Sequence, residues 1–214
     1  SVYLSDDTLV LCSGSKYSKD NTNNLFAHIT NTAYQDADPG FKEEECIFVW
    51  NGESIAPMLL KSKACRNSQE ACERIDDVKR QMRDITGELF RAYESEFGVF
   101  APLESCFEHY GLDFIVDVDW RVYLLEVNPG PDFKQTGDRL SRVIERLMLD
   151  TIDAVLIPQF FGKALQTNQS IDEDEKRAAL QGKLKLVYER HRRKQQNSTS
   201  PSTSSVKQGI NMKV

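Results

Sequence analysis

Residues 111–131, Gly-Leu-Asp-Phe-Ile-Val-Asp-Val-Asp-Trp-Arg-Val-Tyr-Leu-Leu-Glu-Val-Asn-Pro-Gly-Pro, contain two apolar runs separated by a polar turn. The runs, 112–117 and 122–128, are rich in the β-branched and aromatic residues that favour strands. The pattern predicts an antiparallel hairpin with an even-length loop centred on Asp119 and Trp120.

Three side chains with oxygen atoms are expected together at the open end of this hairpin. With an even-length loop, Asp113 falls opposite Glu126, and the two Cβ atoms lie about 5 Å apart on one face. Asn128 lies two residues beyond Glu126, so strand alternation places it on the same face. A loop of odd length would instead separate the two carboxylates onto opposite faces.

Glu126 interrupts residues 122–127, which otherwise have the apolar composition of a buried strand. An unpaired carboxylate buried there would cost several kcal/mol or take up a proton, and two adjacent carboxylates would raise one pKa. A divalent cation would relieve both effects, and carboxylate and amide oxygens suit Mg²⁺ better than zinc. Arginine partners for the two acids, or a solvated sheet edge, are the alternative.

Amphipathic helices are predicted on both sides of the hairpin. From Ser68, the expected N-cap, apolar residues recur at spacings of three and four over about 27 residues, and Gly98 is expected to end this helix. A second helix is predicted from Asp138 to Ile157, and a third from 172 to 194. Two strands are predicted over 2–4 and 8–12, and residues 195–214 are expected to be disordered because they have hardly any large apolar side chains.

The net charge of −6 conceals a strong asymmetry. Residues 183–194 carry +5 and Lys207 and Lys213 add two further charges, so residues 1–182 carry −13. Because phosphate contacts need clustered Lys and Arg, nucleic acid binding is disfavoured, except weakly through 183–194. That segment is equally consistent with a solvated helix end or with docking of an acidic partner.

Membrane and secretory classes are not indicated either. No run of about 18 apolar residues is present, so no membrane span is expected. The five cysteines include no CxxC pair, which favours reduced thiols in a cytoplasmic protein. The chain begins at Ser1 without Met, so we expect it to be part of a longer protein.

Two motifs resemble those of a known family. Leu125-Glu126-Val127-Asn128-Pro129, downstream of a Gly-x-Asp-Phe strand, resembles the metal-binding hairpin of ATP-grasp enzymes. His28-Ile29-Thr30-Asn31 is similar to the His-x-Thr-Asn motif of the tubulin–tyrosine ligase-like branch. The resemblance covers roughly residues 1–160 and implies an α+β fold, the C-terminal portion of an ATP-grasp fold with an antiparallel sheet, long helices and an incomplete nucleotide-binding lobe.

The resemblance also implies boundaries and cofactors. Residues 1–165 would form the ligase-like part, 166–194 a helix with a basic end, and 195–214 a disordered tail. The cofactors would be ATP and Mg²⁺. The metal would be held by Asp113, Glu126 and Asn128, and the last two of these are also the candidate catalytic residues. The candidates for contact with the nucleotide are Thr30, Asn31, His28 and Lys134. The alternative for His28 is a structural role, and the alternative for Lys134 is a solvated position in a loop.

The implied reaction is carboxylate–amine ligation, in which an acyl phosphate forms on a protein or peptide carboxylate and is then displaced by the amine of an amino acid. The alternative is a catalytically weak or inactive module for protein interaction. Two features motivate it: the family's tubulin ligase has an arginine where Leu11 and Cys12 align, and the acidic body would repel acidic tubulin tails. Fungal processing-body-associated proteins carry a C-terminal domain of this kind, which suggests mRNA decapping or processing-body partners in the cytoplasm.

Overall fold

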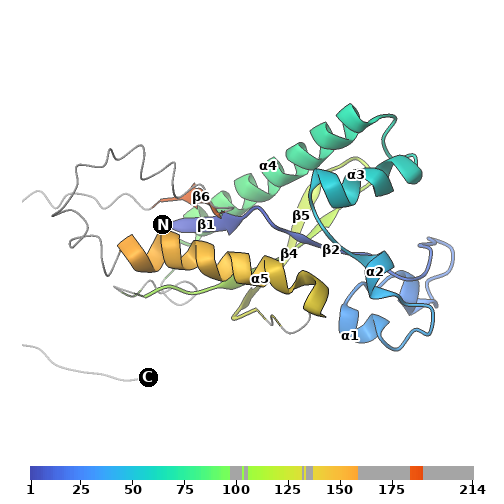
Figure 1. The fold of residues 1–214 in the computed structure, drawn as a ribbon, viewed down its shortest axis with the longest axis horizontal. Helices are drawn as coiled ribbons and strands as arrows, with labels where there is room; N and C mark the ends of the chain where they lie inside the picture. The colour runs from blue at the N-terminus through green and yellow to red at the C-terminus, as the bar shows by residue number, and fades with distance from the viewer. Residues whose placement is uncertain (97–102, 104–105, 132, 134–136, 159–183, 190–214) are drawn as a thin grey trace, which may run out of the picture.

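The computed structural model describes residues 1–96, 103, 106–131, 133, 137–158 and 184–189, and the described part of the chain is α+β (Figure 1). In chain order the elements are β1 (Val2–Ser5), β2 (Leu9–Leu11), a 3-10 turn (Leu25–Ala27), α1 (Thr32–Gln35), α2 (Glu43–Cys46), β3 (Ile47–Val49), α3 (Gly52–Lys61), α4 (Ser68–Ala92), β4 (Tyr110–Val116), β5 (Val122–Pro129), α5 (Gly137–Thr151), a π-helical turn (Ile152–Leu156) and β6 (Leu184–Tyr188). This composition confirms the predicted fold class and is compatible with part of an ATP-grasp fold.

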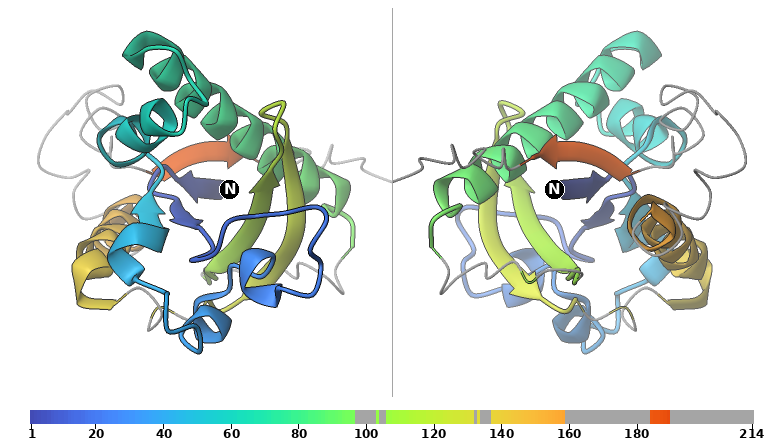
Figure 2. Two further views of the ribbon diagram at one scale, coloured as in Figure 1. Left: turned by 90° about the vertical axis from the view of Figure 1, so that its right-hand side faces the viewer. Right: turned by 90° about the vertical axis from the view of Figure 1, so that its left-hand side faces the viewer.

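The strands form three two-stranded antiparallel sheets in the described part of the chain, β1 with β6, β2 with β3 and β4 with β5. The β1–β6 pair lies between α4 on one side and α5 on the other in the three views of Figures 1 and 2. The two strands predicted over 2–4 and 8–12 are confirmed, and each finds a partner distant in sequence.

Helix α4 supplies one wall of the core. Its N-cap is Asn67, whose side-chain oxygen accepts a hydrogen bond from the Glu70 N–H at 2.9 Å, so the predicted cap at Ser68 was one residue late. The helix ends at Ala92, before the expected end at Gly98. The predicted apolar stripe is confirmed in its first half, where the buried residues are Ala71, Ile75, Val78 and Met82.

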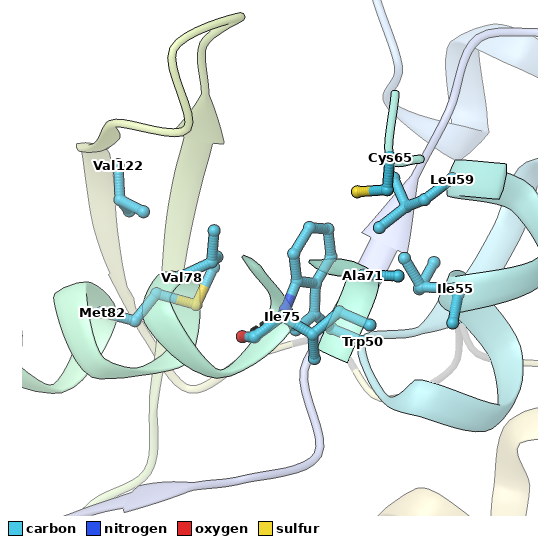
Figure 3. Close-up of a cluster of buried hydrophobic side chains, with 10 residues drawn as sticks. Trp50, Ile55, Leu59, Cys65, Ala71, Ile75, Val78, Met82 and Val122 are labelled. Carbon is cyan, nitrogen blue, oxygen red and sulfur yellow. Dashed lines mark hydrogen bonds between the residues drawn. The ribbon is translucent and has the colours of Figure 1, made fainter. Parts of the chain in front are cut away.

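Trp50 fills the space between α3 and α4 (Figure 3). Its indole N–H donates to the carbonyl oxygen of Ile75 at 3.2 Å, so the polar atom of this buried ring is satisfied. Ile55 and Leu59 of α3 pack in the same cluster, which also includes Val122 at the start of β5. The core therefore joins α3, α4 and the hairpin.

The third predicted helix is wrong at residues 184–188, because Leu-Lys-Leu-Val-Tyr forms strand β6, which pairs with β1. The stretch is rich in residues that suit a strand, and pairing with β1 outweighs the helical pattern of its neighbours. Gly87 in α4 allows this strand to approach, since a Cβ at that position would lie 2.8 Å from the carbonyl oxygen of Val187. Residues 172–183 and 190–214, and with them the rest of the predicted helix and tail, lie outside the described residues.

The predicted helix over 138–157 is confirmed, as α5 and the π-helical turn that continues it. Asp150 is buried in α5 and pairs with Arg146 at 2.9 Å. Among the helices of the described residues, none has the length and apolar character needed to cross a membrane.

Candidate active site

The three predicted metal ligands converge on one face of the β4–β5 hairpin. Asp113 and Glu126 are direct cross-strand partners, as predicted. The side-chain amide of Asn128 donates from Nδ2 to Glu126 Oε1 at 3.1 Å and to Asp113 Oδ2 at 3.4 Å. Two carboxylates and one amide therefore share a single small volume at the open end of the hairpin.

The loop length and the register that produce this pairing differ from the prediction. The loop between Val116 and Val122 has an odd number of residues, which would have placed Glu126 opposite Leu112 and toward the core. A β-bulge at Leu125 shifts the register, because Phe114 pairs with Leu124 while Asp113 pairs with Glu126. The unpaired Leu125 thus restores the carboxylate pair to one face.

That face is open to solvent in the described structure. Asp113, Glu126 and Asn128 are all exposed, so the expectation of a buried Glu126 was wrong. The hairpin covers the core with its other face only, through Phe114, Val122 and their neighbours. Ile115, Tyr123 and Leu125 extend the open face as an exposed apolar strip beside the carboxylates.

Two adjacent carboxylates of this kind suit a divalent cation. The pKa of Asp113 is raised above its ordinary value, although the residue is exposed overall. The largest cause is loss of hydration around the carboxyl, and a hydrogen bond with Glu126 and the charge of Glu126 add to it. Among the described residues, no Lys or Arg forms an ion pair with either carboxylate. The described part of the chain also has no cluster of three or more His, Cys, Asp or Glu side chains suited to a metal. The candidate ligand set is the two carboxylates and the amide oxygen of Asn128. Oxygen ligands of this kind suit Mg²⁺.

Helix α4 fixes the closed end of the hairpin through Gln81, a residue the sequence did not single out. Its Nε2 donates to the carbonyl oxygen of Trp120 at 2.8 Å, and its Oε1 accepts from the Val122 N–H at 3.0 Å. Arg74 of the same helix lies over the Trp120 ring, 5.7 Å from its centroid. The long helix therefore sets where the hairpin points.

Asp117 organises the turn itself. Its Oδ1 accepts hydrogen bonds from the N–H groups of Asp119 and Arg121, both at 2.9 Å, and its Oδ2 accepts one from the Tyr123 hydroxyl at 3.2 Å. The bond from Arg121 contributes most to a pKa of Asp117 below the ordinary value. These hydrogen bonds stabilise the turn over residues 117–121.

The open end of the hairpin is held at Gly130. Its N–H donates to the carbonyl oxygen of His109 at 3.0 Å, and its φ of +63° is a backbone conformation that glycine adopts without strain. The imidazole Nε2 of His109 lies 3.1 Å from the Thr151 hydroxyl of α5, and burial lowers the pKa of His109. The hairpin end is thereby linked to α5.

The second motif lies on a separate loop between β2 and β3. His28 is half-buried, its Nε2 lies 2.9 Å from the carbonyl oxygen of Asn21, and its ring packs edge-on against Tyr17. These contacts fit the structural alternative, and contact of His28 with the nucleotide stays a prediction. Thr30 and Asn31 are exposed at the start of α1. No hydrogen bond or ion pair between described residues joins them to the hairpin carboxylates, and Lys134 lies outside the described residues.

Gln35 holds this loop in place from within. It is fully buried, its Nε2 donates to the carbonyl oxygens of Phe26 (2.9 Å) and Ile29, and its Oε1 accepts from the Gly14 N–H at 3.0 Å. The sequence offers no sign of this role, because a glutamine in a polar loop is normally solvated. The loop that carries Thr30 and Asn31 is thus tied together by the hydrogen bonds of this one side chain.

Comparison with known proteins identifies one family. A sequence model described as the tubulin-tyrosine ligase family matches residues 1–164. The probable tubulin–tyrosine ligase C12B10.04 of Schizosaccharomyces pombe is 36% identical over 171 residues, which are 78% of this chain and 37% of the relative. The probable tubulin–tyrosine ligase PBY1 of Saccharomyces cerevisiae is 32% identical over 157 residues, 73% of this chain and 19% of the relative. The probable tubulin polyglutamylase TTLL9 of Bos taurus is 24% identical over 153 residues, 72% of this chain and 31% of the relative. The chain thus spans well under half the length of these curated relatives.

Proposed function

Because the chain belongs to the tubulin–tyrosine ligase family, we propose that it supplies the metal-holding hairpin of an ATP- and Mg²⁺-dependent carboxylate–amine ligase. The observation that supports this most directly is the contact of Asn128 with both Glu126 and Asp113 at 3.1 and 3.4 Å. The family is one of ligases, and the relatives are named as enzymes of tubulin, which favours a protein or peptide carboxylate as substrate here.

Asp113, Glu126 and Asn128 would hold the metal through oxygen atoms. Asn128 would contribute its amide oxygen, because an amide nitrogen does not ligate a cation; since that nitrogen now faces the two carboxylates, the amide group would turn over when the ion binds. When bound, Mg²⁺ on nucleotide phosphates offsets their negative charge as the phosphoryl group moves to a substrate carboxylate. The resulting acyl phosphate carries a good leaving group, which an amine displaces to form an amide bond and free phosphate.

The chain's own residues serve this reaction by position and charge. The bulge at Leu125 keeps Glu126 on the open face beside Asp113, so both anions are available to one ion. Gln81 and Asp117 hold the turn, which keeps the two strands and their ligands in register. On this proposal, Thr30 and Asn31 contact the nucleotide from the neighbouring loop, which Gln35 fixes.

The test is isothermal titration of Mg-ATP into the full-length protein and its Glu126→Gln variant. Glu126→Gln retains the size of the side chain and removes its charge, so we expect binding to weaken at least tenfold and ligation to be lost while circular dichroism is unchanged. Glu88→Gln, an exposed position on α4, is the matched control and should behave as wild type. Near-normal ligation or ATP hydrolysis by Glu126→Gln would refute the proposed role.

The same titration, combined with an assay of amino-acid incorporation into protein, distinguishes the alternative function, a weak or inactive module for protein interaction. The net charge of −13 over residues 1–182 favours that alternative, because it opposes the approach of an acidic protein tail. Mg-ATP binding without incorporation of an amino acid into any protein would support the module. Cytoplasmic location, processing bodies and decapping partners stay predictions.

A further inference from the structure

Cys12 and Cys46 lie opposite each other where β2 and β3 meet the loop between them. β2 and β3 pair up to Leu11 and Ile47, and one further step of this register pairs the two cysteines. The Cys12 N–H donates to the Cys46 carbonyl oxygen at 2.7 Å, which shows that the backbone pairing continues to this step. In such hydrogen-bonded pairs the Cα atoms are about 5.5 Å apart, within the range that disulfides span.

Cys46 is the last residue of α2, so the closeness of the two cysteines rests on their backbone hydrogen bond, which directly continues the β2–β3 ladder. Both thiols are free, Cys46 is buried with 4% of its surface exposed, and Cys12 is half-buried. Burial raises the pKa of Cys12, and the neighbouring Cys46 raises it further. Pairing of these two thiols therefore needs little movement of the backbone.

The pair lies at the base of the loop that carries the proposed nucleotide contacts. Residues 13–45, which lie between the two cysteines, carry His28, Thr30 and Asn31. Inside the loop the main anchor is the buried Gln35, which joins Gly14 to the carbonyl oxygens of Phe26 and Ile29. A covalent link at the base would close this loop and limit its opening.

We propose that Cys12 and Cys46 form a reversible disulfide by exchange with a small-molecule disulfide such as oxidised glutathione. Cys12, the more accessible of the two, first loses its proton to solvent, which its raised pKa makes slow; the thiolate then attacks one sulfur of the small disulfide, so that one glutathione thiolate leaves and a mixed disulfide remains. The thiolate of Cys46 then attacks the Cys12 sulfur and releases the second glutathione. Two protein thiols are oxidised, and one small disulfide is reduced to two thiols.

The experiment equilibrates the folded full-length protein with reduced and oxidised glutathione, traps free thiols by alkylation and digests with trypsin. Lys16, Lys19 and Lys42 lie between the two cysteines, so digestion separates the peptides that contain them unless a disulfide joins them. We expect a joined Cys12–Cys46 peptide pair that rises with the ratio of oxidised to reduced glutathione and disappears with reductant. Trypsin should also cleave within residues 13–45 several-fold more slowly in the oxidised protein.

Three variants make the result specific. Cys12→Ser and Cys46→Ala should each abolish the joined pair, and the first changes a half-buried site, so it tests the idea even if the second fails to fold. Cys65→Ser, which alters another buried cysteine, should leave the joined pair intact. The proposal is overturned if Cys12 carries only glutathione in the folded protein, or if the joined pair forms only after denaturation.

Discussion

Gln81 of α4 donates a hydrogen bond from Nε2 to the carbonyl oxygen of Trp120 at 2.8 Å and so ties the long helix to the turn of the hairpin. Its Oε1 accepts from the N–H of the buried Val122 at 3.0 Å. Trp120 has a φ of +65°, a left-handed conformation that is unfavourable for a residue with a side chain. The contacts with α4 hold the turn in this conformation.

Gln81→Met should therefore destabilise the protein. Methionine matches the length of glutamine but leaves the Val122 N–H and the Trp120 carbonyl without their partner, at a cost of about 1–3 kcal/mol. Urea unfolding followed by circular dichroism measures the change. Gln69→Met is the matched control, because Gln69 is an exposed glutamine of the same helix whose side chain donates to the exposed Glu73, and its effect should stay within about 0.5 kcal/mol. Equal stabilities of the two variants would contradict the role of Gln81.

Gly87→Ala should destabilise the protein although alanine is the better helix former. The added Cβ would lie 2.8 Å from the Val187 carbonyl oxygen, a backbone atom that can move only with strand β6. Overpacking of this kind costs about 1–3 kcal/mol, against a gain of about 1 kcal/mol in helix propensity. The thermal midpoint should fall, and the amides of β1 and β6 should exchange faster.

Gly52→Ala is the control, since a Cβ there meets nothing within 4 Å. It should leave the thermal midpoint unchanged or slightly higher. A midpoint for Gly87→Ala at or above wild type would show that β6 does not pack on α4 as described.

The hairpin illustrates what the sequence could and could not predict. The two carboxylates and Asn128 were placed on one face from an expected even-length loop and strand alternation, and the structure confirms that they share a face. The predicted loop length was wrong, because the loop has an odd number of residues. The bulge at Leu125 restores the pairing of Asp113 with Glu126. A bulge leaves no mark in a run such as Tyr123-Leu124-Leu125, because all three side chains suit a strand and any of them could be the extra residue.

The failures elsewhere have a common physical cause. Strand β6 and the contacts of Gln35 and Gln81 depend on partners distant in sequence, which local patterns do not encode. The first half of the α4 stripe, by contrast, follows from spacing of apolar residues within one helix, so it was predictable. The exposure of Glu126 was missed because an apolar run does not show whether its strand is covered on one face or on both.

Asp117→Asn should make the protein less stable at pH 7, and this difference should shrink in acid. Hydrogen bonds from backbone N–H groups, that of Arg121 foremost, lower the pKa of Asp117 in the folded state. A lowered pKa contributes stability that is present above the ordinary Asp range and is lost as the pH falls through the folded value. Thermal midpoints measured from pH 7 down to about 2 should therefore converge for variant and wild type.

Asp119→Asn provides the comparison within the same turn, because the Asp119 backbone N–H donates to Asp117 and its exposed carboxylate accepts none of the bonds that order the turn. Its midpoint should follow that of wild type across the same pH range. A constant gap between Asp117→Asn and wild type down to pH 2 would indicate that the ionisation of Asp117 has no part in holding the turn.

Gln35→Met should loosen the loop that carries Thr30 and Asn31 while the hairpin stays intact. The substitution leaves the Gly14 N–H and the carbonyl oxygens of Phe26 and Ile29 without their buried partner, at a cost of about 2–4 kcal/mol. Hydrogen exchange should accelerate at Gly14, and trypsin should cleave faster after Lys16 and Lys19, whereas exchange in β4 and β5 should be unchanged. Because the proposed nucleotide contacts of Thr30 and Asn31 depend on this loop, Mg-ATP affinity should fall even though all three hairpin ligands are intact. Unchanged exchange at Gly14 would show that Gln35 does not hold the loop. A loosened loop with normal Mg-ATP affinity would instead remove Thr30 and Asn31 from the nucleotide site and leave the hairpin as its sole support.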